Sequence, residues 1–367
     1  MVYLYYTLIL ITFVSVLQSR RKTSFSQVLL LIIVFCIFAF SKNISDQVSY
    51  AAFYDNNSFS NIQYINYNES SILFSLFAAT AKAIGLDFLG FRIILFAISC
   101  LVCILVYRRC TSLGMLLVAF SAIPLFFDMI QIRFFCAEVV LIVALSALSN
   151  GKKLVYIMLV LLASLFHSMI IVLLIFAILP QKQVIVKDKT KQGLLVILVL
   201  LFSFMGRNVL PLISSFVLNF GVFDEYSGYM TMTVRNGFLL YFSYQLLNIV
   251  LANRIHKEFM DKNDVPEWNV KFDIINNNIQ LVGLIFVVFT LININFCRYF
   301  RLFMIINSID LSSLYYVNRS MGAKRDYRIK ASYSALLFLV VLIVWLLGES
   351  FINHSFINII SEFFELS

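Results

Sequence analysis

Charged residues are scarce in this chain, and their scarcity decides the class of protein. Of the 367 residues, 13% are charged and 61% are hydrophobic, and the mean hydropathy is +0.92. A soluble domain of average composition has roughly 25% charged and about 45–50% apolar residues. A water-soluble core of this length could not hide so many apolar side chains. The composition therefore excludes an ordinary soluble protein and indicates an integral membrane protein.

Proline is also rare, with four residues in the whole chain, so most helices can run unbroken. The long apolar runs show no alternation, whereas a membrane barrel is built from alternating strands of about ten residues. In hydrocarbon, every backbone N–H and C=O group must be paired within its own segment, which a helix achieves. We therefore expect an all-α polytopic membrane protein, a single domain over residues 1–367 with about 12 transmembrane helices.

Histidine is scarce as well, and its three copies (His167, His256 and His354) lie far apart. No acidic pair resembling D-x-D accompanies them, so we expect no metal site. No Gly-rich phosphate loop is present, so we expect no nucleotide cofactor. The six cysteines lie in or beside apolar runs. We interpret them as packing residues, including Cys100 and Cys103, whose CxxC spacing lacks a second ligand pair.

The net charge of +9 is explained by orientation in a membrane, and we expect no nucleic-acid partner. Lys and Arg cluster in short loops between apolar runs, as the positive-inside rule requires of cytoplasmic loops. With the N-terminus outside, most of the 28 Lys and Arg residues fall on the cytoplasmic side. The expected membrane segments are 3–18, 27–41, 88–107, 112–128, 131–149, 154–166, 167–180, 193–206, 236–253, 274–293, 298–317 and 332–349.

The apolar run 154–179 could form one long helix or two shorter ones. One helix would reverse the orientation of everything after it. Two helices keep the lysine-rich stretch 181–191 in the cytoplasm, so we predict a break at His167.

Two sizeable polar segments, 42–70 and 206–235, are predicted as periplasmic loops. Between the first loop and the next span lies the apolar stretch 71–86. We interpret it as a non-spanning or re-entrant outer helix, because a spanning helix here would export Arg108 and Arg109.

Several polar residues lie at outer helix ends, where orientation does not explain them. Arg133 begins one helix, Arg298 and Arg301 begin another, and His167 lies among apolar residues. An Arg at membrane depth costs ~2.5–3.5 kcal/mol on insertion scales, so each needs a partner or an aqueous cavity. Snorkelling to the interface is the ordinary alternative for the arginines, and simple packing for the histidine. As a set, forked guanidinium groups suit a lipid-linked phosphate or diphosphate.

Loop 42–70 offers groups that suit a hydroxyl-rich ligand. Tyr50 and Tyr54 carry amphipathic rings, and neighbouring Asn, Gln and Asp residues supply donors and acceptors. An ordinary polar outer loop is the alternative interpretation.

Five short motifs follow one another between about residue 42 and about residue 303. They are D-x-x-x-Y at Asp46 and Tyr50, Glu69 before an apolar run, I-R-x-x-x-A at 132–137, L-F-H-S at 165–168 and F-x-R-Y-F at 296–300. In this order they resemble the EpsG/Wzy-type group of bacterial O-antigen and exopolysaccharide polymerases. Phe134 and Met169 depart from the family's pattern, which commonly has Gln after the motif Arg and Pro near the motif His.

The resemblance implies a membrane glycosyltransferase without a metal. It would transfer a growing glycan from undecaprenyl diphosphate to the terminal sugar of another lipid-linked repeat unit, at the periplasmic face of the bacterial inner membrane. Its expected partners are these lipid-linked oligosaccharides and the bilayer, with a chain-length regulator as a further candidate.

The resemblance also implies roles for individual residues. The expected diphosphate ligands are Arg133, Arg298 and Arg301. The expected glycan contacts are Tyr50, Tyr54, Tyr226 and Tyr229. His167 fits a catalytic base by type, with Asp46 and Glu69 as alternatives.

Two other functions stay open at this point. A flippase for lipid-linked oligosaccharides would also have about a dozen helices, but its charges should line a central cavity and its halves should repeat. An O-antigen ligase is a close enzymatic alternative that the sequence separates poorly from a polymerase.

The predicted orientation can be tested by cysteine-accessibility labelling in intact cells. A cysteine at Ser227 should label from the periplasm, and cysteines at Asp188 and Lys324 should be protected until the cytoplasm is opened. Labelling of positions 188 and 227 from the same side would contradict the break at His167.

Overall fold

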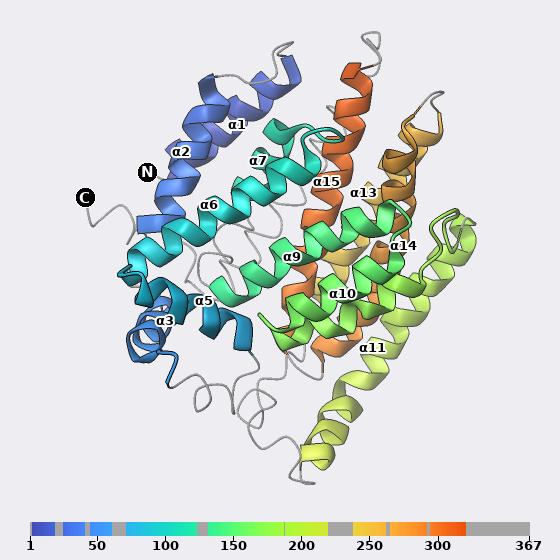
Figure 1. The fold of residues 1–367 in the computed structure, drawn as a ribbon. Coiled ribbons are helices and arrows are strands. Elements are labelled where there is room, and N and C mark those ends of the chain that lie inside the picture. Colours follow the sequence, from blue (N-terminus) through green and yellow to red (C-terminus); the bar gives the residue numbers. More distant parts are fainter. Residues whose placement is uncertain are drawn as a thin grey trace. The chain divides into compact units, whose positions relative to one another are not determined.

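The computed structural model describes residues 2–18, 25–40, 45–60, 71–122, 131–186, 188–218, 238–261, 265–291 and 294–320. Secondary structure in these ranges is entirely helical (Figure 1), as the lack of alternation predicted. The described residues divide into two compact units. The first comprises the described residues up to Ile178 together with 311–320, and the second comprises those from Leu179 to Asp310.

The helices of the first unit follow the apolar runs closely. They are α1 (Val2–Gln18), α2 (Phe25–Phe40), α3 (Ser45–Asn56), α5 (Ile72–Ala83), α6 (Phe88–Tyr107), α7 (Leu113–Ala122), α9 (Ile132–Ser149), α10 (Lys153–Ser164) and the 3₁₀ helix η1 (Ser168–Ile178). The start of α6 has a clear local cause, because the Asp87 side chain accepts a hydrogen bond from the Gly90 amide at 2.7 Å and so caps the helix.

Helix α9 is the central helix of the first unit. Of its candidate membrane span 72% is buried, against 28% for α6. The Tyr107 hydroxyl at the end of α6 donates to the Ile142 carbonyl of α9 at 2.6 Å, and the rings of Phe96 and Phe135 stack. α9 therefore gives the other helices of this unit a fixed support.

The break predicted at His167 is confirmed. α10 ends at Ser164, η1 begins at Ser168, and the Tyr156 hydroxyl of α10 donates to the Leu173 carbonyl of η1 at 2.6 Å. The two segments therefore lie side by side as a hairpin whose tip carries His167.

The second unit contains α11 (Lys189–Leu218), α13 (Phe238–Met260), α14 (Glu267–Thr290), the short η3 (Ile294–Cys297) and the first half of α15 (Arg298–Ser320). Two helices extend beyond the predicted membrane segments. α11 continues past Gly206 into the expected loop 206–235, and α14 begins at Glu267, directly after Pro266, rather than near 274. Both helices are longer than their apolar runs, so the ends of these helices cannot be located from hydropathy alone.

Four described helices are long and apolar enough to cross a membrane. They are Phe88–Tyr107, Ile132–Ser149, Lys189–Gly206 and Glu267–Thr290. α5, with 12 residues, is about 18 Å long and falls short of the ~30 Å hydrocarbon layer. The total number of spans and the re-entrant character of α5 stay predictions, and the expected segment 332–349 lies outside the described residues.

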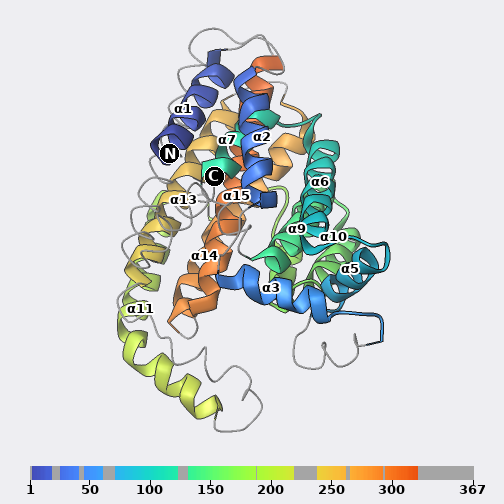
Figure 2. The same cartoon turned by 90° about the vertical axis from the view of Figure 1, so that its left-hand side faces the viewer.

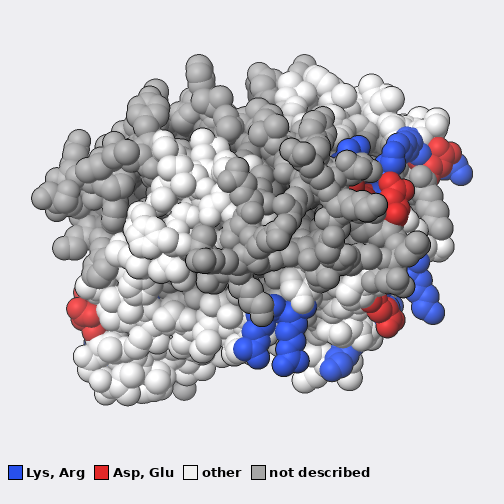
Figure 3. Space-filling model, turned by 90° about the horizontal axis from the view of Figure 1, so that it is seen from above, with Lys and Arg blue, Asp and Glu red and all other residues white. Residues whose placement is uncertain are grey.

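Basic side chains stand at helix ends in both units. Arg108 and Arg109 follow α6, Lys153 begins α10, and Lys257 lies in the last turn of α13. On the face seen in Figure 3, Lys and Arg side chains stand out in small groups, and some of them lie beside Asp and Glu side chains. A cation in the last turn of a helix also complements the helix dipole. The cytoplasmic location of these charges stays a prediction.

Gly283 of α14 provides a test of the packing in the second unit. A Cβ atom there would lie 2.4 Å from Gln245 Nε2 and 3.0 Å from Phe303 Cε2. We expect Gly283→Ala to destabilise the protein by about 1–3 kcal/mol, because the added methyl overfills the contact. Thermal unfolding of the purified protein in detergent measures the effect.

Gly193→Ala on α11 is the matched control, since nothing lies within 4 Å of a Cβ atom there, and it should leave stability unchanged or slightly raised. Equal unfolding temperatures for the two variants would contradict the packing described for Gly283.

Candidate functional site

Arg133 lies in the first turn of α9, and two hydroxyl groups hold its guanidinium. Its Nε donates to the Tyr50 hydroxyl at 3.3 Å, and its Nη1 donates to Ser71 Oγ, also at 3.3 Å. Its Cζ lies 5.4 Å from the centroid of the Tyr50 ring, within the range of a cation–π contact. The predicted pair Arg133 and Tyr50 therefore does lie together, and Ser71 joins it.

His167 lies at the tip of the hairpin formed by α10 and η1, close to the first turn of α9. Its ring meets the ring of Phe134 edge to face, with centroids 5.2 Å apart, and Phe134 directly follows Arg133. Its backbone amide donates to the Ala163 carbonyl at 3.1 Å, which ends α10. The half-buried His167 side chain is thus fixed at the level of the first turn of α9.

Helix α5 connects the surroundings of Arg133 with the tip of the hairpin. It begins directly after Ser71, and the Leu73 amide donates to the Leu165 carbonyl at 3.1 Å. The rings of Phe77 and Phe166 pack with centroids 5.6 Å apart. Four segments of the first unit therefore converge: α3, the start of α5, the start of α9 and the tip of the hairpin.

Helix α3 is in turn fastened to α5 and to the start of α6; Figure 2 shows α3 and α5 side by side. The Asn57 side-chain amide donates to the Ser75 carbonyl at 2.7 Å, and Lys82 Nζ donates to the Asp55 carbonyl. The Tyr54 hydroxyl donates to the Leu86 carbonyl at 2.7 Å. These bonds hold Tyr50 at a fixed position against Arg133.

Tyr54 is buried in the structure. Its side chain is 2% exposed and stacks on Phe91, so these contacts account for it as a packing residue, and its glycan contact stays a prediction. Burial, together with the nearby Asp87 and Asp55, raises the pKa of its hydroxyl. Tyr54 therefore stays a neutral donor to Leu86.

Two further cations of the first unit, Lys82 and Arg92, also have structural partners. Lys82 holds α3, as described. The Arg92 guanidinium donates to the carbonyl of Phe38 in the last turn of α2 and lies over the rings of Phe38 and Phe88 at 5.9 and 5.8 Å. Because Arg92 is 3% exposed, its contacts account for it as a buried cap of α2.

Arg298 and Arg301 belong to the second unit, in the first turn of α15. Arg298 is half-buried, whereas Arg301 is 3% exposed, so snorkelling does not explain Arg301. The neighbouring aromatic residues fix the helix: Tyr299 packs on Phe286 of α14, and Phe300 stacks on Tyr241 of α13. At 100° per residue, the two arginines therefore point to another side of α15.

The other predicted site residues lie wholly or partly outside the described residues. Asp46 lies in α3, but its side chain is outside the described part. Glu69, Tyr226 and Tyr229 lie outside the described residues altogether.

The match to known families settles the class of protein. A model of the EpsG family matches residues 24–361, nearly the whole chain. The chain belongs to the EpsG family. This is a Wzy-like, polymerase-type family, so the resemblance drawn from the motifs is confirmed. No curated protein and no solved structure shows significant similarity to the chain.

This EpsG protein also carries a polar network that the motifs did not reveal. In the second unit, five side-chain amides each donate to the next acceptor at 2.8–3.3 Å, across α13, α14 and α15. In donor order they are Gln245, Gln280, Asn276, Asn307 and Asn248. Asn276 also donates to Asp310 Oδ2 at 2.8 Å. The signal in the sequence was the polar run 276–280 inside an apolar span.

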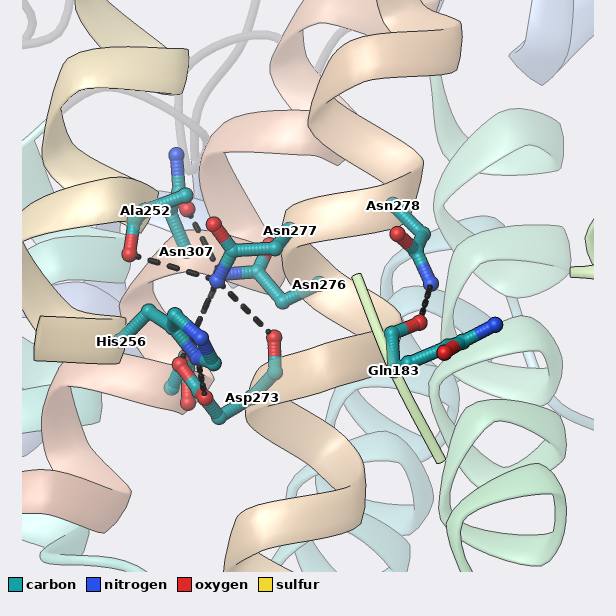
Figure 4. A network of polar contacts seen from close by, with 9 residues as sticks. Gln183, Ala252, His256, Asp273, Asn276, Asn277, Asn278 and Asn307 are labelled. Atoms are coloured by element: carbon teal, nitrogen blue, oxygen red, sulfur yellow. Dashed lines mark hydrogen bonds and ion pairs between the residues drawn. The ribbon is translucent and has the colours of Figure 1, made fainter. Parts of the chain in front are cut away.

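The rest of the network extends along α14 to both sides (Figure 4). His256 Nδ1 lies 2.5 Å from Asp273 Oδ2, and the Asn277 side chain donates to Asp273 Oδ1 at 3.3 Å. Asn278 points the other way and donates to the Gln183 carbonyl at 3.1 Å. Within the described residues no cluster of His, Cys, Asp and Glu could hold a metal ion. The polar side chains of this network bond to one another and to nearby backbone carbonyls.

Tyr54→Phe separates packing from ligand binding in this EpsG protein. The variant loses one buried hydrogen bond to Leu86, so we expect a loss of about 1 kcal/mol in stability with polymer formation retained. Thermal unfolding and a polysaccharide gel measure the two effects. Loss of polymer at unchanged stability would contradict the packing role.

Proposed function

We propose that this EpsG protein is a polysaccharide polymerase that works at the periplasmic face of the bacterial inner membrane. It would transfer a growing glycan from undecaprenyl diphosphate to the terminal sugar of another lipid-linked repeat unit. The observation that carries the proposal is the convergence of Arg133 and His167 in one unit of an EpsG chain.

In the proposed reaction, the bond between the anomeric carbon and the diphosphate oxygen breaks, and its electron pair leaves on the diphosphate. The acceptor hydroxyl oxygen forms the new glycosidic bond and releases its proton to a base. Negative charge therefore grows on the leaving group. A preorganised guanidinium stabilises such charge strongly in a site that excludes water, and Arg133 is preorganised by Tyr50 and Ser71.

We assign the proton acceptor to His167, because a neutral imidazole is the side chain that most often serves as a general base. Its fixed place at the hairpin tip, next to Phe134, puts it within the same group of segments as Arg133. Asp46 and Glu69 stay the alternative bases, Tyr226 and Tyr229 the glycan contacts, and Arg298 and Arg301 further diphosphate ligands. We propose that no metal takes part.

The arginines provide the first test. Arg133→Ala and Arg298→Ala should abolish polymer while protein levels stay near normal. Arg→Lys at either position should also impair polymerisation strongly, because a point charge cannot make the forked contact. Arg109→Ala, at an exposed position after α6, is the control and should leave the polymer unchanged. Full activity of both Lys variants would exclude the bidentate role.

The product left by a deletion strain separates a polymerase from a flippase. Without a polymerase, single lipid-linked repeats still reach the surface, so a lipopolysaccharide gel should show a single-repeat band and no ladder. The wild-type gene should restore the ladder, and His167→Ala should not. A bare core without that band would support transport. An intact ladder with His167→Ala would transfer the role of base to Asp46 or Glu69.

A further inference from the structure

The two hydroxyl groups that hold Arg133 have unused hydrogen-bonding capacity. Each of them, Tyr50 Oη and Ser71 Oγ, accepts a hydrogen bond from the guanidinium. A hydroxyl group has one hydrogen to donate besides the lone pairs with which it accepts. Because Arg133 can only donate, the hydrogen of each hydroxyl has to find another acceptor.

Neither hydrogen has an acceptor among the described residues. Ser71 is 2% exposed, so water does not easily replace the missing acceptor. A buried donor left without an acceptor costs about 1–3 kcal/mol, and native structures rarely tolerate one without a reason. An oxygen-rich ligand at Arg133 would supply acceptors for both hydroxyls at once.

The local structure fixes both hydroxyl groups where they are. The Ser75 side chain donates to the Ser71 carbonyl at 3.2 Å, which closes the first turn of α5. The ring of Tyr50 packs edge to face against Phe74, with centroids 5.8 Å apart. Since α3 is itself tied to α5 and α6, neither group has to be ordered when a ligand binds.

We propose that Ser71 and Tyr50 donate their hydroxyl hydrogens to the diphosphate, next to the donors of Arg133. The inference rests on the proposed function and deepens it by naming two further ligands of the anion. It also moves Tyr50 from the glycan to the diphosphate. A hydroxyl can accept one hydrogen bond and donate another at the same time. Accepting from Arg133 polarises its O–H bond and strengthens the hydrogen bond that it donates.

The test measures the affinity of the purified, full-length protein for farnesyl diphosphate, a short and soluble isoprenyl diphosphate, by calorimetry. Ser71→Ala and Tyr50→Phe should each weaken binding roughly tenfold, as expected for a lost hydrogen bond to a charged group. Ser71→Thr keeps the hydroxyl and should bind within about threefold of the wild type. Ser149→Ala removes a buried hydroxyl at the far end of α9, which bonds to the Leu145 carbonyl of its own helix at 3.0 Å, and should leave the affinity unchanged.

The outcomes separate this inference from the function on which it rests. Normal binding by Ser71→Ala and Tyr50→Phe, with lost binding by Arg133→Ala, would overturn the hydroxyl donors and leave the diphosphate site at Arg133 intact. Wild-type protein that does not bind farnesyl diphosphate, or Arg133→Ala that binds it normally, would overturn both. Farnesol, which lacks phosphate, is the control ligand. An equal loss of farnesol binding in Ser71→Ala would mean that the site had changed shape, and would also overturn the inference.

Discussion

Hydrocarbon offers a protein no hydrogen bonds, so the buried polar groups of a membrane protein must pair with one another. In the second unit this requirement is met by a directed chain of amides, from Gln245 through Gln280 and Asn276 to Asn307. Because an amide donates at one end and accepts at the other, reversing one member would break the bonds on both sides of it. This row of hydrogen-bonded amides therefore fixes the register of α13, α14 and α15. Through α15 it fixes the place of Arg298 and Arg301.

The same requirement shapes the surroundings of Arg133. Its described partners are two hydroxyl groups and an aromatic ring, contributed by α3 and by the residue before α5. These partners fix the direction of the guanidinium. The two hydroxyl groups also keep their own hydrogens, which they can donate to a ligand. By contrast, the Arg92 guanidinium donates to a backbone carbonyl, which has no hydrogen to offer a ligand. The half-buried Arg133 and the buried Arg92 thus differ in the chemistry around them, and of these two the surroundings of Arg133 suit the recognition of an anion better.

The sequence predicted those features that depend on local composition and on charge bias. The bounds of α6 follow from its apolar run, and the break at His167 follows from the need to keep the lysines after it in the cytoplasm. Contacts across long stretches of chain could not be predicted. Ser71 meets Arg133 across 62 residues and Tyr54 meets Leu86 across 32, and no periodicity records either pairing. For this reason Ser71 was missed, and Tyr54 was assigned to the glycan although it is buried.

The depth of His167 in the membrane bears on the choice between glycan transfer and transport. α10 has 12 residues, so it rises about 18 Å and cannot cross the ~30 Å hydrocarbon layer alone. Its packing beside α9 nevertheless brings His167 to Phe134, near the beginning of a helix long enough to span. In the predicted orientation this is the outer boundary of the membrane. A lipid-linked substrate places its tail in hydrocarbon, its diphosphate at the boundary and its sugars in water. The proposed anion site and base at that one depth suit transfer between two such lipids, whereas a transporter would place its substrate site near the middle of the membrane.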